Sequence, residues 1–496
     1  MQERSTKKLF LSLEDNINYL YELNTKDSDF VLRRFKIGET NALLLTCEGL
    51  SDKILIGEAV LKPILSCDCM PKNPTLQYAY IRDRILCASE QSEVFDFDAL
   101  FKGVMGGSCA ILIDGVPRTL MLDVRGFDRR SISEPIMEIT DRGSRESFVE
   151  VARINMTMIR RRLKTPDLRF ETLEIGEESS TSVIMCYLAD RASESILQQV
   201  RKRLKKIKIE SVLESGYIQP FLDTKRVSFF SGVGYVERPD TMCAKMLEGR
   251  VGIIIDGAPL ALIVPYLFSE NFQSFDDYCN RPFYATFSRM LKYFSFFVSI
   301  ILPGLYVAIG TFHPELLPES LLYDIAASEA RTPFSLAMEA FIIHIIYEIL
   351  HQAGLRLPKP VGNTISVVGA LVIGESAVTA GIISAPMVMV VAFTAISAFL
   401  VPSLYDASAV LRLMFILIGG FTGIFGVLIF LTVILINICS IDPYGIPYTS
   451  PFAPFDVRAM RDGVLRLGWK TLNKHVFRVQ NAYGSEEKRK ASEACE

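Results

Sequence analysis

Residues 106–122 read GGSCAILIDGVPRTLML, and residues 247–263 read LEGRVGIIIDGAPLALI. Each stretch has an apolar run, then Asp-Gly, one further residue, a Pro and a second apolar run. Asp114-Gly115 and Asp256-Gly257 predict tight turns between antiparallel strands, because Gly tolerates the positive φ that such turns require. The same β-hairpin is therefore predicted twice, which indicates an internal duplication.

A second pair of matching segments lies upstream of these hairpins. Ile37-Gly38-Glu39 precedes the strand-like ALLLTC and the amphipathic DKILIGEAVLKPIL, while Ile175-Gly176-Glu177 precedes VIMCYL and the helix-like SESILQQVRKRLKKI. We therefore predict an α/β region of two related subdomains, at 30–126 and 167–267. A linking helix near Arg145–Leu163 would join them, with basic residues in its last turn, where positive charge suits the helix dipole.

The second half of the chain has a different composition. Half of all residues are apolar and 22% are charged, yet the basic residues between 290 and 440 are only Lys292, Arg331, Arg356, Lys359 and Arg412. An apolar region this poor in charge predicts an all-α transmembrane bundle. A net charge of −3 does not favour binding to nucleic acid. The ten cysteines include no CxxC pair, so reduced thiols are expected rather than a zinc site.

These patterns predict a division of the chain into six parts. The parts are a helical N-terminal lead at 1–29, subdomain 1 at 30–126, a linking segment with a basic helix at 127–166, subdomain 2 at 167–288, a membrane domain at 289–440 and a short helical cytoplasmic tail at 441–496.

Five apolar segments follow one another in the membrane half: Phe294–Phe312, Phe334–Leu350, Ile365–Ile383, Pro386–Leu400 and Leu411–Ile438. No signal peptide is recognised at the N-terminus, so the first ~285 residues are expected in the cytoplasm. The C-terminal tail is basic, which also favours the cytoplasm and requires an even number of crossings. We therefore predict four spans, with the short segment Phe334–Leu350 at the interface because it carries Glu339, His344 and Glu348.

The third apolar segment carries two faces. Small residues that permit close helix packing are Gly362, Ser366, Gly369 and Gly374, with Gly419 and Gly423 in the last segment. The candidate pore-lining residues are Thr364, Val368, Leu371, Glu375 and Thr379. A carboxylate and hydroxyls along one intramembrane stripe suit a polar pathway, and a buried polar group satisfied by a neighbouring helix is the alternative.

No catalytic, cofactor or metal site is predicted. His344, Glu348 and His351 share a helical face, but a di-iron bundle would need a second Glu-x-x-His motif, which is absent. A polar interfacial face is the preferred interpretation. No Walker loop, GxSxG elbow or HExxH motif is present in the sequence.

The chain resembles the A subunit of the spore germinant receptors, the GerA family, from about Asp29 to Trp469. The most specific stretches are RGSRESFVEVARINMTMIRRRLKTPDLRFE (142–171), SGYIQPF (215–221) and YVERPDTMCAKMLEGRVGIIIDGAPLALIVP (235–265). Further matches are LPGLYVAIGTFHPELLP (302–318), VGALVIGESAVTAGIISAPMVMVVA (368–392) and PYGIPYTSPFAPF (443–455). This resemblance implies a subunit of the inner spore membrane, beside a permease-like B subunit and a lipoprotein C subunit. It also implies a ring-shaped homo-oligomer around a pore that releases monovalent cations when a germinant binds.

Three other functions remain open at this stage. A nutrient transporter would show inverted repeats in its membrane half, whereas the detectable repeat lies in the soluble half. A non-conducting scaffold for the permease-like partner is opposed only by the polar stripe. An auxiliary germination protein of the same family would have the same fold without a dedicated nutrient sensor.

Overall fold

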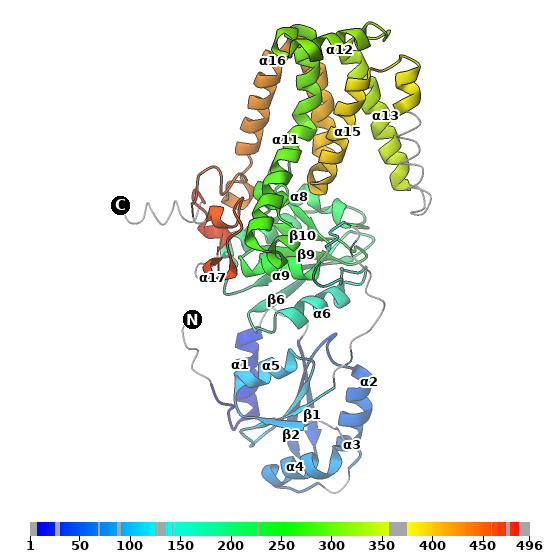
Figure 1. Cartoon of the computed structure of the whole chain (residues 1–496). Helices are drawn as coiled ribbons and strands as arrows, with labels where there is room; N and C mark the ends of the chain where they lie inside the picture. Colours follow the sequence, from blue (N-terminus) through cyan, green and yellow to red (C-terminus); the bar gives the residue numbers. More distant parts are fainter. Residues whose placement is uncertain are drawn as a thin grey trace, which may run out of the picture. The chain divides into compact units, whose positions relative to one another are not determined.

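The computed structural model describes residues 7–24, 30–67, 70–86, 91–124, 126, 135, 137–140, 142–225, 228–356, 374–457, 459–472 and 477–485. The chain forms two compact units (Figure 1), which are described separately below. The first unit comprises Met1–Thr224, Val233–Pro265 and Phe477–Asn481, and the second comprises Lys225–Gly232, Tyr266–Val476 and Ala482–Glu496.

The first unit contains two five-stranded antiparallel sheets with the same strand order. One has the order β1-β2-β4-β5-β3 and the other β6-β7-β9-β10-β8. The first sheet consists of β1 (Phe30–Ile37), β2 (Thr40–Cys47), β3 (Gln91–Val94), β4 (Cys109–Ile113) and β5 (Thr119–Leu122). The second consists of β6 (Leu168–Ile175), β7 (Thr181–Leu188), β8 (Gly234–Val236), β9 (Val251–Ile255) and β10 (Ala261–Val264). The duplication predicted from the sequence is therefore confirmed.

Both Asp-Gly pairs form the predicted hairpin turns. Gly115 joins β4 to β5 with a φ of 81°, and Gly257 joins β9 to β10 with a φ of 88°. These values lie in the left-handed region, where a side chain would be strained.

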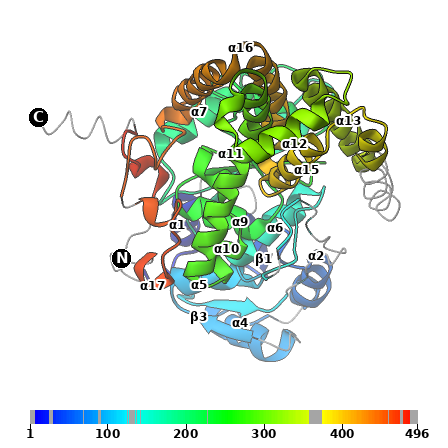
Figure 2. The ribbon, with the colours of Figure 1, turned by 45° about the horizontal axis from the view of Figure 1, so that its top comes forward.

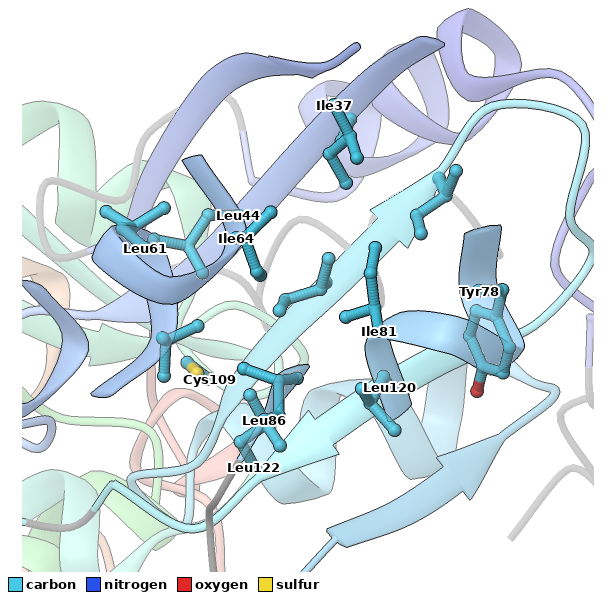
Figure 3. Packing of buried hydrophobic residues seen from close by; sticks show 14 of the residues in the cluster. Ile37, Leu44, Leu61, Ile64, Tyr78, Ile81, Leu86, Cys109, Leu120 and Leu122 are labelled. Atoms are coloured by element: carbon cyan, nitrogen blue, oxygen red, sulfur yellow. The ribbon is translucent and has the colours of Figure 1, made fainter. Parts of the chain in front are cut away.

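Helices cover both faces of the first sheet. On one face, α1 (Leu13–Asn24) and α5 (Phe97–Val104) pack on Leu43 and Leu45. On the other, a helical segment made of α2 (Lys53–Leu55), a π-helical stretch (Ile56–Leu61) and α3 (Lys62–Leu65), together with α4 (Pro74–Tyr80), packs on Leu44 and its neighbours (Figure 3). Because side chains alternate along a strand, apolar residues at successive positions fill both cores.

One face of the second sheet is covered by α6 (Ala152–Arg162) and α9 (Pro239–Leu247), whose side chains share one core with it. The remaining helices of this repeat are α7 (Glu194–Leu204) and α8 (Gln219–Leu222). The helix predicted from SESILQQVRKRLKKI corresponds to α7, which buries its apolar stripe at Ile196, Leu197, Val200 and Leu204.

The repeated unit begins earlier than the predicted boundaries, because each sheet holds a helix that precedes it. The Asp114 carboxylate accepts a hydrogen bond of 2.9 Å from the Leu13 N–H at the start of α1. The Asp256 carboxylate accepts one of 2.9 Å from the Ala152 N–H at the start of α6. The helix α6, which lies within the segment Arg145–Leu163 predicted as a linking helix, is thus the counterpart of α1.

The same pairing recurs at an asparagine in each helix. Asn16 Oδ1 accepts from the Phe10 N–H at 2.9 Å, and Asn155 Oδ1 accepts from the Val149 N–H at 2.8 Å. Each side-chain amide also donates back, to the Phe10 and Val149 carbonyls respectively. Each asparagine therefore holds the segment that precedes its helix in the same way in both repeats.

A short segment before α6 is anchored on the second repeat. The Glu237 carboxylate accepts from the Met137 and Glu138 N–H groups at 2.8 and 3.2 Å. The Glu138 carboxylate accepts from the Arg238 N–H at 3.1 Å. Burial raises the pKa of Glu138 to about 7, despite the opposing charge of Arg238.

The second unit is a helical bundle. Its helices are α10 (Asp276–Cys279), α11 (Pro282–Phe312), α12 (Glu319–Glu329), α13 (Leu336–Arg356), α15 (Ala385–Phe399), α16 (Tyr405–Cys439) and α17 (Trp469–Leu472). Within the described ranges, three helices are long and apolar enough to cross a membrane, at Pro282–Phe312, Leu336–Arg356 and Pro402–Cys439. The helix α15 is apolar but shorter.

The third of these helices is folded back on itself at Gly423, which has a φ of 67° and a ψ of −158°. The Phe415 and Phe430 rings pack with their centroids 4.9 Å apart. The two residues are 15 positions apart in the sequence. In one straight helix they would therefore lie about 22 Å apart, at 1.5 Å per residue. The segment is therefore a helical hairpin, with arms at 405–422 and 424–439, each roughly 24–27 Å long.

Two predictions about the membrane half change as a result. The segment Leu411–Ile438, predicted as one span, contains the turn of a hairpin. The segment Phe334–Leu350, predicted to lie at the interface because it is short, belongs to a helix of 21 residues that is long enough to span. The pattern of apolar residues does not reveal the hairpin, because a turn at a single Gly leaves the apolar run uninterrupted.

The C-terminal tail is mostly turns and packs on the base of α11. Arg289 is fully buried there, and its guanidinium pairs with Asp277 at 2.7 Å and with Asp462 of the tail at 3.0 Å. The Tyr278 hydroxyl donates to Asp462 at 2.9 Å. Because Arg289 also donates to the Asp462 and Gly463 carbonyls, the tail is an integral part of this unit.

Candidate functional site in the membrane bundle

The polar residues of the bundle lie where α11, α13, α15 and α16 pack together. The first arm of α16 lies against α11 in both Figure 1 and Figure 2. A Cβ atom added at Gly419 would lie 2.4 Å from the Gly304 carbonyl oxygen, and one added at Gly304 would lie 2.5 Å from the Phe415 carbonyl oxygen. The two helices therefore meet backbone to backbone, as small residues permit.

The predicted packing glycines occupy different positions. Gly362, Ser366 and Gly369 lie outside the described residues. A Cβ at Gly374 would make only an ordinary contact, 3.9 Å from Val388 Cγ1. Gly423, predicted as one half of a Gly-x-x-x-Gly packing motif, forms the hairpin turn and lies beside the Phe312 ring of α11. The requirement for glycine at this position is thus conformational.

Of the predicted pore-lining residues, Thr364, Val368 and Leu371 lie outside the described residues. Glu375 and Thr379 are described, and both side chains are exposed. The Thr379 hydroxyl donates to the Glu375 carbonyl at 2.7 Å, so the two residues share one helical face. An exposed carboxylate on an apolar bundle must face water or another polypeptide, because contact with lipid is costly.

A buried polar group that the sequence analysis placed at the interface is Glu339, in the first turn of α13. Its side chain is 1% exposed, and one carboxylate oxygen accepts hydrogen bonds from the N–H and the hydroxyl of Ser384, both at 2.6 Å. These residues belong to different segments 45 positions apart. Ser384 directly precedes α15, so the contact ties the starts of α13 and α15 together.

The rest of the polar face of α13 packs on α16. Glu348 accepts from the Tyr405 hydroxyl at 3.0 Å, and the His351 ring lies 4.4 Å from the Tyr405 ring. His344 is buried, and one of its ring nitrogens bonds the Ala340 carbonyl at 2.8 Å. The face predicted to be interfacial is therefore largely internal. Among the described residues, no three His, Cys, Asp or Glu side chains come together as a metal site would require.

A buried arginine of α16 lies beside this polar face of α13. Arg412, on the first arm of α16, is 2% exposed, and its guanidinium lies 5.7 Å from the centre of the Tyr347 ring. Its Nε and Nη2 atoms have no hydrogen-bond partner among the described residues. The sequence signal for this residue was available: Arg412 is the sole basic residue in the last apolar segment. Charged residues inside membrane bundles commonly mark functional positions.

Apolar helices of spanning length, packed around buried ionisable side chains and joined to a duplicated α/β region, define a multi-helix membrane-associated protein. The family model described as Bacillus/Clostridium GerA spore germination protein matches residues 18–476. The chain therefore belongs to the GerA family of spore germination proteins.

Similar proteins cover nearly the whole chain. Spore germination protein KA of Bacillus subtilis (strain 168) is 37% identical over 463 residues, covering 92% of this chain and 85% of its own. The uncharacterized membrane protein YfkQ of the same strain is 35% identical, covering 96% and 92%. The crystal structure of the N-terminal domain of the A subunit of the Bacillus megaterium spore germinant receptor GerK3 is 30% identical. It covers 53% of this chain and 99% of that one, with a TM-score of 0.42.

Proposed function

We propose that this chain is the A-type membrane subunit of a nutrient germinant receptor in bacterial spores. In this proposal, copies of the chain form a germinant-gated cation channel in the inner spore membrane, and the cation release triggers germination. A permease-like B subunit and a lipoprotein C subunit would complete the receptor. No catalytic role is proposed.

The observation that carries the channel proposal is the exposed polar face of Glu375 and Thr379. In a bundle otherwise rich in exposed apolar side chains, this face needs either water or a neighbouring copy of the chain. If several copies of the chain formed a ring with these faces turned inward, each face would contact both water and a neighbouring copy. Thr364, Val368 and Leu371 would continue the pathway, with Val368 and Leu371 as its apolar constriction.

The hairpin at Gly423 supports placing the α/β region and the tail on the same side, facing the spore core. Counted as two crossings, the hairpin gives an even total when all five predicted apolar segments span. The segment Phe334–Leu350 then need not be removed from the count, and its length agrees with a span.

Cation efflux from liposomes tests the proposal. The purified chain would be reconstituted alone and with its permease-like partner, and germinant would be added to each preparation. Efflux altered by Glu375→Gln or Val368→Ala, and unaltered by Ser376→Ala on another face of the same helix, supports a pore in this chain.

Two outcomes favour the alternatives. If confirmed oligomers give no efflux in either preparation, the chain would be a non-conducting scaffold or an auxiliary germination protein. If efflux occurs but none of the substitutions changes it, the conducting pathway would lie elsewhere.

A further inference from the structure

Three buried oxygen atoms from three helices lack partners near the end of the bundle where α13 begins. Glu339 uses one carboxylate oxygen to accept from Ser384, and its Oε2 atom has no hydrogen-bond partner among the described residues. The same is true of Oε1 of Glu329, at the end of α12, and of the Tyr306 hydroxyl on α11. Tyr306 packs against the apolar cluster that contains Leu336 and Ala340 of α13, and the Glu329 carboxylate lies beside Gly310, one helical turn from Tyr306.

Helix packing places the Glu329 carboxylate beside α11. The Glu329 Oε1 atom lies 3.9 Å from where a Cβ atom of Gly310 would stand. That Cβ would meet Leu336 at 2.4 Å, so the close packing of α11 on α13 depends on glycine here. The two carboxylates are therefore brought together by helix packing and not by an exposed acidic loop.

The charges of the two carboxylates are not balanced by the protein in the described part of the chain. No described basic side chain pairs with Glu329 or Glu339, and the nearby Arg331 is exposed. Both Ser384 donors bond the same carboxylate oxygen of Glu339, so its Oε2 atom is left to meet a ligand. A buried ionised carboxylate without a partner is costly, so a proton or a cation must compensate it.

We propose that Glu329, Glu339, Tyr306 and the Ser384 hydroxyl form a binding site for a hard cation. Every available ligand atom is an oxygen, which excludes a preference for soft metals. Two carboxylates match the charge of a divalent ion, and Ca²⁺ tolerates irregular oxygen shells completed by water better than Mg²⁺ does. The ion would fasten α11, α12 and α13 to the start of α15.

This site holds an ion in place and does not require that the chain conducts. Its test is therefore a binding measurement on the purified full-length chain in detergent, with CaCl₂ titrated into choline chloride buffer. Binding would be followed by equilibrium dialysis and by the midpoint of thermal unfolding. NaCl, KCl and MgCl₂ at matched ionic strength would control for general salt effects.

The expected result is Ca²⁺-dependent stabilisation of the wild type that Glu339→Gln abolishes. Tyr306→Phe, which keeps the shape of the ring, should weaken Ca²⁺ binding by about tenfold or more through the loss of one ligand oxygen. Glu329→Gln should weaken it further because a charged ligand is lost. Glu319→Gln, on the exposed surface of α12, should bind like the wild type.

Failure of Ca²⁺ to stabilise the wild type would overturn the proposal. So would equal Ca²⁺ binding by the wild type and by Tyr306→Phe and Glu329→Gln, which remain informative if Glu339→Gln does not fold. Stability that depends on pH and not on Ca²⁺ would show that the carboxylates share a proton instead. None of these results bears on efflux, so this proposal and the channel proposal fail independently.

Discussion

Replacing Gly419 by alanine tests whether α11 and the first arm of α16 meet backbone to backbone. The added Cβ atom would lie 2.4 Å from the Gly304 carbonyl oxygen and 3.1 Å from its carbonyl carbon. Both atoms belong to helix backbone, so the helices must separate and cannot relieve the overlap by a change of rotamer. Overpacking of this kind costs about 3 kcal/mol at the upper end, and alanine recovers about 1 kcal/mol of helix propensity.

The expected net loss for Gly419→Ala is therefore about 2 kcal/mol, or roughly a 4–8 °C lower unfolding midpoint for a unit of this size. Thermal unfolding of the full-length chain in detergent measures it. Gly374→Ala is the matched control, because its Cβ would meet only Val388 Cγ1 at 3.9 Å and should change the midpoint little. If Gly419→Ala unfolds no earlier than Gly374→Ala, the close approach of the two helices is wrong.

Three further predictions concern the turn and the α/β region. Gly423→Ala should cost about 1–3 kcal/mol, because its φ of 67° and ψ of −158° are almost confined to glycine, and thermal unfolding beside Gly374→Ala would show it. Asp114→Ala and Asp256→Ala should each lower the stability by about 1 kcal/mol, because each leaves a helix N–H unsatisfied. Thermal unfolding should show similar losses for both. If Asp256→Ala left the unfolding midpoint unchanged, the two repeats would not be equivalent. The pKa of Glu138 is raised from 4.5 to about 7, so the folded state binds the proton more tightly and stability should fall as pH rises from about 4.5 through 7. Thermal unfolding of Glu138→Gln at a series of pH values should show a smaller loss of stability over this range. If the pH dependence equalled that of the wild type, Glu138 would not be its source.

Much of the α/β region could be predicted because its signals are local. The Asp-Gly turns and the apolar runs around them are adjacent in sequence, and they gave the hairpins and the duplication. The extent of the repeat was missed, since the hydrogen bond from Leu13 to Asp114 joins residues 101 positions apart. The matching asparagines, Asn16 and Asn155, were the available signal for it.

The membrane bundle was harder to predict for two physical reasons. Helical periodicity continues on both sides of Gly423, so composition alone cannot distinguish a long helix from a hairpin. The polarity of Glu339 suggested the interface, whereas a single serine before α15 satisfies one of its oxygens inside the bundle. Tertiary contacts of this kind leave no trace in the sequence near either residue.

The attachment of the tail to α11 has a consequence for genetics. A premature stop codon after α16 would preserve every apolar helix, so the truncated product could still enter the membrane. It would nevertheless lack Asp462 and leave the buried guanidinium of Arg289 with Asp277 as its one remaining counter-ion in the described part of the chain. Late nonsense alleles should therefore resemble complete loss of the gene, and the severity of an allele should not decline toward the 3′ end until codon 462 has been passed.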